Sequence, residues 1–450
     1  MSHITSLATD LRRIVRGQVL TDDTSRQRRA CDFGRLHQHT PALVVVPSNV
    51  NDIAAIVRFA ARADVKVTTQ AAAHSQGGQS LSDDGVLIDM HGFGRVEAID
   101  DDGATIDVGT GVLWRDVAEA ALACGLIPPV LTDNLFTTVG GTASVGGIGF
   151  SSHRYGIQLD QHVALEIVSG DGEIRWCSLE EHPDLFLHAL GGLGQFGIVT
   201  KARHRLRRHG QYVRQSVAAY RTLDALLDDV RRLANDDGAD FVRAGALMVG
   251  GEPMWALAME TDSSSGEETT HDALRRQLGN ASRIGTTKQL PYADFVLGER
   301  ATETPKWQRD AAVVAPGLDL LLPDDVARTF IPDLMASLPP DVREHSKFLL
   351  LFLRRSRLTR PMFMAPDSEN LVLLTMEPVM SRDRAAELMT ILDNADRQGR
   401  AVGGVRYLAG SVRYDDAQWR EHYGAHWDDI TRAKREWDPH GLFVSSAVRF

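Results

Sequence analysis

The 450-residue sequence has few cysteines, no long apolar run and no concentration of positive charge. Cys31, Cys124 and Cys177 lack CxxC spacing, so the sequence supports neither a disulfide framework nor a metal site. Cys124 follows an amphipathic helical pattern and is expected to be buried. No apolar stretch is long enough to span a membrane, and the first residues lack the apolar core of a secretory signal. We therefore expect a cytoplasmic protein without a membrane partner.

The charge balance excludes a second class of function. The formal net charge is −11 and no basic run stands against it, so no nucleic-acid partner is expected. The chain is long enough for two packed domains, and no internal repeat or low-complexity tract interrupts it.

One histidine stands in a loop of very small residues. The segment 71–80, AAAHSQGGQS, contains His74 and follows a pattern of strand, turn, amphipathic helix and strand that ends at residues 66–70. Small side chains allow a flat or anionic ligand to touch the backbone, and α/β proteins commonly bind ligands where such a strand ends. The loop is therefore a candidate binding site.

Two further segments are rich in glycine. Residues 131–149, LTDNLFTTVGGTASVGGIG, have too few bulky side chains for a core of their own, and we expect a loop whose free N–H groups hold a pyrophosphate. Residues 189–206 run from a glycine-rich turn into a strand rich in β-branched residues, and this strand could line the same binding site.

Together these segments resemble the vanillyl-alcohol oxidase and p-cresol methylhydroxylase superfamily of FAD-linked oxidases, and within it the cytokinin dehydrogenases. His74-Ser75 with Gln79 resembles the Gly-His-Ser…Gln motif, whose histidine carries FAD covalently. Thr132-Asp133 with the Thr-Val-Gly-Gly-Thr run from Thr138 resembles the motif whose aspartate is the catalytic base. Residues 191–200 and the closing residues 420–443 resemble two further blocks.

The resemblance implies the site residues. Asp133 is expected to be the catalytic base, and no metal is expected. The residues expected to contact FAD are His74, Ser75, Gln79, Asp133, Thr138, Gly140, Gly141, Ser144, Ile148 and Ile198. Alternatives remain open: a noncovalent role for His74, a turn cap for Asp133, and tight packing for the others. Arg154 could pair with a phosphate or with the cap, and Tyr407-Leu408 could match a pair near the substrate.

Two segments depart from the family pattern. Residues 70–73 read Gln-Ala-Ala-Ala where the family has Arg-Gly-Arg-Gly, so phosphate contact there must rely on the backbone. Residues 444–447 read Val-Ser-Ser-Ala where the family has Ser-Pro-Gly-Gln, so a glutamine that covers the flavin is absent.

The expected fold is α+β, a two-domain FAD-binding fold of the vanillyl-alcohol oxidase type with an inserted α/β substrate cap. Residues 1–208, completed by 412–450, are expected to bind FAD, and residues 209–411 to form the cap. Cap segments such as KFLLLFLRR and NLVLLTMEPV read as buried strands, and helices should cover one side of their sheet. Residues 260–272 read as a polar loop and 286–308 as a lid or linker. Trp419, Trp427 and Trp437 are expected in the core.

The expected function is FAD-dependent oxidation of a CH–NH bond in a small amine to an imine, by hydride transfer to flavin N5. Two alternatives are an alcohol or sugar oxidase on the same fold, which would usually place tyrosines near N5, and a flavoprotein whose pocket binds or cyclises a ligand without net redox. The electron acceptor is expected to be oxygen or a quinone-like compound. Substrate identity is outside the reach of the sequence.

Overall fold

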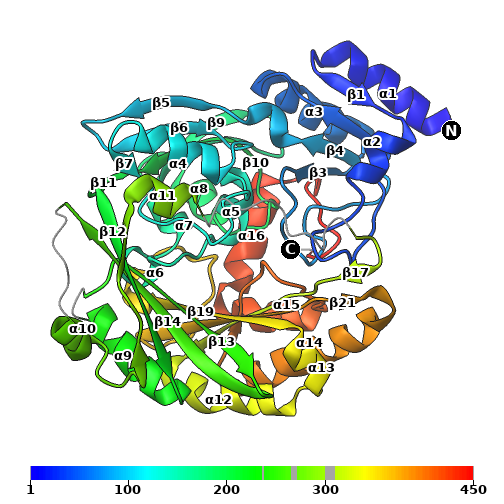
Figure 1. Cartoon of the computed structure of the whole chain (residues 1–450). Helices are drawn as coiled ribbons and strands as arrows, with labels where there is room; N and C mark the ends of the chain where they lie inside the picture. Colours follow the sequence, from blue (N-terminus) through cyan, green and yellow to red (C-terminus); the bar gives the residue numbers. More distant parts are fainter. Residues whose placement is uncertain (1, 236–237, 265–270, 299–309, 449) are drawn as a thin grey trace.

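The computed structural model describes residues 2–235, 238–264, 271–298, 310–448 and 450 (Figure 1). Near the N-terminus a four-stranded sheet has the order β1-β2-β4-β3, in which β2, β4 and β3 are parallel. The expected strand, helix and strand before His74 are β2, α3 and β3, which confirms that reading. The elements of this region are α1 (Ser2–Ile14), β1 (Gln18–Leu20), α2 (Asp23–Arg28), β2 (Leu43–Val46), α3 (Val50–Ala63), β3 (Val67–Gln70), β4 (Val86–Asp89) and η1 (Met90–Phe93).

A second sheet of five antiparallel strands follows, in the order β5-β6-β10-β8-β9. Short helices connect its strands, and the segments between them carry the glycine-rich runs. The elements are β5 (Val96–Asp100), β6 (Thr105–Gly109), α4 (Trp114–Leu122), β7 (Leu126–Ile127), α5 (Val139–Val145), α6 (Ser152–Tyr155), α7 (Gln158–Gln161), β8 (His162–Val168), β9 (Ile174–Ser178), α8 (Pro183–Ala189), β10 (Ile198–Arg205) and β11 (Arg207–Arg208).

The middle of the chain builds one large antiparallel sheet in the order β15-β12-β14-β13-β19-β20-β18-β22, with β16 paired to β12. Its strands are β12 (Tyr212–Tyr220), β13 (Phe241–Val249), β14 (Glu252–Ser263), β15 (Arg283–Ile284), β16 (Lys288–Pro291), β18 (Leu318–Pro323), β19 (Ser346–Arg354), β20 (Asn370–Pro378) and β22 (Val405–Arg406). A separate pair joins β17 (Val313–Val314) to β21 (Met380–Ser381).

Side-chain alternation gives the large sheet two different faces. Leu350 and Phe352 of β19 pack with the helices that cover one face. Leu351 and Leu353, one position along, belong to the core shared with the N-terminal half of the chain. Figure 1 shows the helices below the sheet and the two smaller sheets above it. The helices below the sheet are α9 (Leu223–Asn235), α10 (His271–Gln277), α12 (Asp324–Ser337), α13 (Pro340–Glu344), η5 (Arg382–Arg384) and α14 (Ala385–Ala401). By contrast, α11 (Tyr292–Leu297) packs on α4, and η4 (Arg355–Arg357) lies against α6.

The C-terminal tail returns to the first sheet. After α15 (Asp416–Tyr423), η6 (Gly424–His426) and α16 (Trp427–Trp437), the Val67 N–H donates to the Leu442 carbonyl and the Val444 N–H donates to the Val67 carbonyl. Trp419 and Trp427 are buried in the core, in agreement with the packing role expected for them.

Two local expectations were wrong. Residues 139–145 of the expected loop form helix α5, because Thr138 caps its first turn through a hydrogen bond from the Gly141 N–H. Cys124 is exposed because α4 ends before it.

Two polar stretches lie only partly within the described residues. The stretch 260–272 contains the end of β14 and the start of α10, and the stretch 286–308 contains β16 and α11. Their residues 265–270 and 299–308 lie outside the described part. None of the described helices has the length and apolar character needed to cross a membrane.

Candidate active site

A cavity of about 610 Å³ lies between the N-terminal half of the chain and the large sheet. Its walls come from the His74 loop, the segment from Thr132 to Ile148, the start of β10, the tail and the strands β13, β18, β19 and β20. Every residue expected to contact FAD lines this one cavity: His74, Ser75, Gln79, Asp133, Thr138, Gly140, Gly141, Ser144, Ile148 and Ile198. Segments far apart in the sequence therefore meet as the motifs predicted.

The backbone of the His74 loop is suited to hold oxyanions. No hydrogen bond joins the N–H groups of residues 72–75 to another of the described residues. Ala73 has φ +54°, a left-handed conformation that interrupts the extended chain. Successive N–H groups around such a residue can form a concave anion site. This supports the expectation that the alanines which replace the family's glycines and arginines leave phosphate contact to the backbone.

The glycine-rich helix α5 is a close-packed wall. The Gly140 N–H donates to the Thr110 carbonyl, and the Gly141 N–H is used by Thr138, so the nest expected at these two residues was wrong. A Cβ on Gly140 would lie 2.8 Å from the Thr110 Cβ, and one on Gly146 would lie 2.6 Å from the Tyr407 ring. These glycines therefore allow the chain to approach its neighbours closely.

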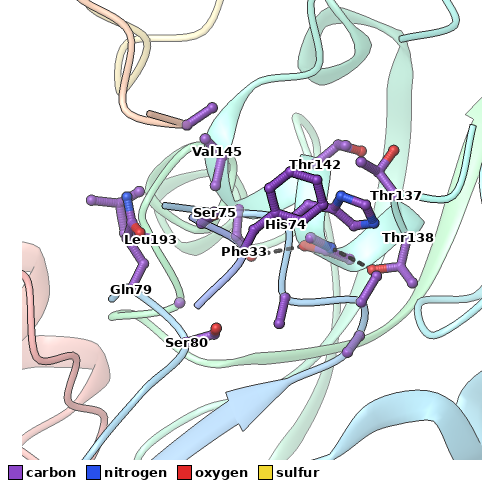
Figure 2. Close-up of a pocket in the computed structure, with 18 of the residues that line it drawn as sticks. Phe33, His74, Ser75, Gln79, Ser80, Thr137, Thr138, Thr142, Val145 and Leu193 are labelled. Carbon is purple, nitrogen blue, oxygen red and sulfur yellow. Dashed lines mark hydrogen bonds between the residues drawn. The ribbon is translucent and has the colours of Figure 1, made fainter. Parts of the chain in front are cut away.

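His74 is held beside an aromatic ring and is neutral. Its ring centroid lies 4.6 Å from that of Phe33, and its Nδ1 lies 3.4 Å from Nδ2 of Asn134. Figure 2 shows the imidazole beside Phe33, on the side of the pocket where Thr137 and Thr138 lie. Burial lowers the pKa of His74 to about 4, against a smaller opposite effect of the Phe136 carbonyl. An imidazole that is neutral at neutral pH has a free electron pair for bond formation.

Asp133 points into the cavity and pairs with the large sheet. Its Oδ2 accepts a hydrogen bond from Nζ of Lys347 at 3.1 Å, and its side chain is 41% exposed. The turn that follows is capped by Asn134, whose Oδ1 accepts from the Phe136 N–H at 2.8 Å. Because Asn134 performs this role, the turn-cap alternative for Asp133 loses its support.

Burial and charge act in opposite directions on Lys347. Burial lowers the pKa of Lys347, but the charge of Asp133, its hydrogen bond and the charges of Glu377 and Asp319 raise it above its usual value. The ammonium group is therefore retained at neutral pH next to the carboxylate.

The large sheet supplies polar groups that the sequence analysis missed. On β20, Thr375 donates to Asp319 of β18 at 2.6 Å, and Glu377 accepts from Gln76 at 3.1 Å. Burial raises the pKa of both Asp319 and Glu377. The signal was present in the strand patterns: Lys347 and Glu377 stand at alternate positions with leucines, on the face that lines the cavity.

Tyr407 also reaches the cavity. Its hydroxyl accepts a hydrogen bond from the Gly147 N–H at 3.0 Å, and burial raises its pKa far above the ordinary value in spite of that bond. Arg154, by contrast, pairs with Asp240 of the large-sheet region. Of the two alternatives for Arg154, a phosphate or the cap, the structure therefore shows the contact with the cap.

The tail covers one side of the cavity where the family glutamine is missing. Phe443 and Val444 line the cavity, and the Ser446 hydroxyl donates to the Gly78 carbonyl at 2.7 Å. The Ser446 side chain thus attaches this cover to the same loop that carries His74.

An acidic cluster lies outside the cavity. Asp184, His188 and Asp429 offer ligand atoms within 4.8 Å of one another. Arg432 pairs with both aspartates, which neutralises charge that a metal ion would otherwise compensate. The cluster is therefore accounted for as an ion-pair network between α8 and α16.

The cavity fits the expected cofactor on four counts. It has free N–H groups for a pyrophosphate, a neutral imidazole, a close-packed glycine wall for a flat ring and an apolar strip from Leu349, Leu351 and Leu373. Groups of these kinds are the ones that a dinucleotide with a planar ring system requires.

Comparisons with known proteins agree with this fit. Residues 41–178 match a family described as an FAD binding domain, and residues 254–447 match one described as cytokinin dehydrogenase 1, FAD and cytokinin binding. The chain is 33% identical over 431 residues to an uncharacterized oxidoreductase of the fasciation locus of Rhodococcoides fascians, covering 94% of this chain and 97% of that protein. It is 28% identical to cytokinin dehydrogenase 4 of Arabidopsis thaliana (94% and 90% covered) and 29% identical to cytokinin dehydrogenase 6 of Oryza sativa subsp. japonica (95% and 90% covered).

Proposed function

This chain belongs to the family of FAD-linked oxidoreductases that includes the cytokinin dehydrogenases, and from that premise we propose that it oxidises the CH–NH bond of a small amine to an imine. The observation that carries the proposal is the position of Asp133, a carboxylate in the cavity with Lys347 as its ion-pair partner. The bound FAD supplies the acceptor for the hydride.

Asp133 takes the proton in the proposed reaction. A hydride leaves the carbon with its electron pair, and the N–H proton passes to the Asp133 carboxylate, so a C=N bond replaces the C–N bond. Removing the proton during this step avoids a high-energy cation, and such general-base catalysis typically contributes about 10²–10⁴-fold in rate. Lys347 holds the Asp133 carboxylate in place through a hydrogen bond from its Nζ, and a carboxylate is the form of the side chain that can accept a proton.

The charge of the cavity supports an amine as substrate. Three carboxyl groups, those of Asp133, Asp319 and Glu377, line the region next to Lys347. Carboxyl groups attract a cationic or N–H-donating ligand, and the leucines of the same wall accept an apolar substituent. A small amine with an apolar side group meets both requirements.

A tether through His74 forms part of the proposal. The neutral imidazole would bond to the methyl carbon at C8 of the flavin ring, and its position in the Gly-His-Ser-like motif supports this role. One methyl C–H bond and the imidazole N–H bond would break in exchange, the flavin itself would take up the two electrons and two protons, and the electron acceptor would then reoxidise it. The covalent bond would prevent loss of the cofactor.

Tyr407 supports a second candidate, oxidation of an alcohol. A tyrosine that lines the cavity could take the place of the aspartate as base. However, burial raises the pKa of Tyr407, which makes its hydroxyl hard to ionise and its phenolate unavailable near neutral pH. Asp133 is therefore the preferred base, and an amine the preferred substrate.

The test is a screen of amines and alcohols for anaerobic bleaching of the flavin in the purified protein. Amines are expected to bleach it, and Asp133→Asn is expected to slow reduction by about 10²–10⁴-fold with a normal flavin spectrum. Asp64→Asn, an equal change at a residue whose side chain is 91% exposed, should leave the rate unchanged.

Other outcomes separate the alternatives. Bleaching by alcohols alone, lost in Tyr407→Phe and kept in Asp133→Asn, would favour the alcohol oxidase. Absence of bleaching by any compound that binds would favour a flavoprotein without net redox.

A further inference from the structure

A second cavity, of about 140 Å³, lies at the β22 edge of the large sheet. Its walls come from β22, helix α14 and the segment that leads into α15, and it shares no lining residue with the first cavity. Arginines form much of the lining: Arg397, Arg400, Arg406 and Arg413.

Arg406 is buried with three of its five N–H donors unused. It is 2% exposed, and its Nη2 donates to the carbonyls of Gly317 at 2.9 Å and Ser411 at 2.7 Å. Its Nε and Nη1 have no hydrogen-bond partner within the described part of the chain. No described carboxylate lies within 4 Å of its guanidinium group either.

The remaining charges do not compensate Arg406. Arg400 pairs with Asp396 at 3.0 Å and with Glu421 at 2.8 Å, and Arg413 pairs with Asp393. Arg397, on the exposed side, hydrogen-bonds only to Asn394 among the described residues. The charge of Asp319 acts on Arg406 from beyond ion-pair distance, and burial raises the pKa of that carboxyl group, so Arg406 has no carboxylate partner at close range among the described residues.

We propose that this cavity binds a small oxyanion, a phosphate or a carboxylate, through Nε and Nη1 of Arg406. A buried guanidinium group with unused donors is costly unless an anion completes it. The planar fork of Nε–H and Nη–H matches two oxygens of a carboxylate or phosphate group. Arg397 lies at the mouth and adds a second positive charge to attract the ligand.

The site lies next to the first cavity along the chain. Arg406 precedes Tyr407, whose ring lines the cavity of His74 and whose N–H donates to the Asp319 carbonyl. An anion at Arg406 would therefore contact the same extended segment that bears a flavin-cavity residue.

Isothermal titration of the FAD-loaded protein with inorganic phosphate, and separately with acetate, tests the proposal at an ionic strength held constant with sodium chloride. Loading with FAD keeps the anion out of the pyrophosphate region. Saturable one-to-one binding of at least one anion is expected. Binding of phosphate, of acetate or of both shows whether the site takes phosphate groups, carboxylate groups or either. Arg406→Met should weaken it by about tenfold or more, since charge-assisted hydrogen bonds are lost.

Arg435→Met is the matched control, because Arg435 is exposed on α16 and outside the cavity lining. If Arg406→Met does not fold, Arg397→Gln is tested in its place. Arg397 is the exposed arginine of the cavity lining, and its loss should weaken anion binding several-fold. Absence of saturable heat with both anions, or an affinity unchanged in the cavity variant that folds, would overturn the proposal.

Discussion

At the scale of single residues, the two groups of the proposed chemistry line one cavity, as their motifs predicted. His74 and Asp133 are separated by more than fifty residues of sequence. Each contacts a neighbour from another segment: His74 lies against Phe33, and Asp133 pairs with Lys347. One prediction tests the role of His74 and a second tests the ion pair of Asp133.

The first prediction concerns the flavin tether. Protein precipitated with acid should remain yellow, because a covalent bond survives unfolding. His74→Ala should lose the acid-stable colour and keep part of its noncovalent FAD, because the backbone N–H groups of residues 72–75 are unchanged. Absorbance of pellet and supernatant measures both quantities. Complete release of colour from the unchanged protein would show that no tether exists.

The second prediction concerns the ion pair of the proposed base. Lys347→Met removes the hydrogen bond that holds the Asp133 carboxylate in place, so the proposed base loses part of its orientation. Anaerobic reduction of the flavin by an amine should slow by several-fold, a modest loss because both side chains of the pair are about half exposed. Lys288→Met, at an exposed position of β16, is the control. Identical reduction rates for Lys347→Met and the unchanged protein would remove Lys347 from the mechanism.

At the scale of elements, the closing turn after α16 depends on one buried ion pair. Nζ of Lys434 donates to Asp438 at 2.7 Å and to the carbonyls of Phe443 and Gln195. Asp438 also accepts from the N–H groups of Leu442 and Phe443. Burial lowers the pKa of Lys434, although Asp438 opposes this. These bonds position the tail that covers the flavin cavity.

The third prediction follows from this arrangement. Lys434→Met leaves Asp438 buried without its cation, and loss of one partner of a buried pair typically costs about 3–5 kcal/mol. The melting temperature and the amount of FAD retained should both fall. Arg435→Met, the exposed neighbour on the same helix, should change neither. Normal FAD retention in Lys434→Met, measured on folded protein, would show that the tail does not hold the cofactor.

At the scale of the whole molecule, burial keeps several histidines neutral. Burial lowers the pKa of His74 to about 4 and that of His162 to about 3, and it lowers that of His204 well below the ordinary value. For His422 burial and the charges of Arg400 and Arg406 lower the pKa to about 3. His162 and His204 stack edge to face at 4.7 Å beside Trp114, deep in the core.

The fourth prediction is loss of stability in acid. The unfolded chain binds these protons near pH 6.5 and the folded chain only near pH 3–4, so stability is fully present above about pH 6.5 and falls as the pH drops toward 3. Each histidine contributes up to ~1.4 kcal/mol per pH unit inside that window. Buried carboxyls oppose the trend, since burial raises the pKa of Asp32 to about 7.

Urea unfolding between pH 7.5 and pH 5 measures this effect. The free energy of unfolding should decrease steadily over that range. A free energy that stays constant or rises would show that the buried carboxyls outweigh the histidines. Asp32→Asn removes one of the opposing groups and should make the decrease steeper.

Local sequence by itself determined much of the fold and the cofactor region. Residue patterns predicted α3, β19 and β20, and the resemblance of short motifs to a known family predicted a set of residues that line one cavity. Motifs of this kind are readable because glycines and small side chains are required wherever a backbone must approach closely. The identity of a base candidate, Asp133, was also readable from its motif.

Only the tertiary structure decided which groups act on one another. The strand patterns show Lys347 and Glu377 only as polar positions among leucines, because a polar residue in a strand acquires its partner only when the sheet closes over another segment. The same holds for the unused donors of Arg406, since burial and the lack of a partner are properties of packing. Sequence patterns report which face of an element is buried, whereas pairing across more than two hundred residues, as between Asp133 and Lys347, depends on the complete fold.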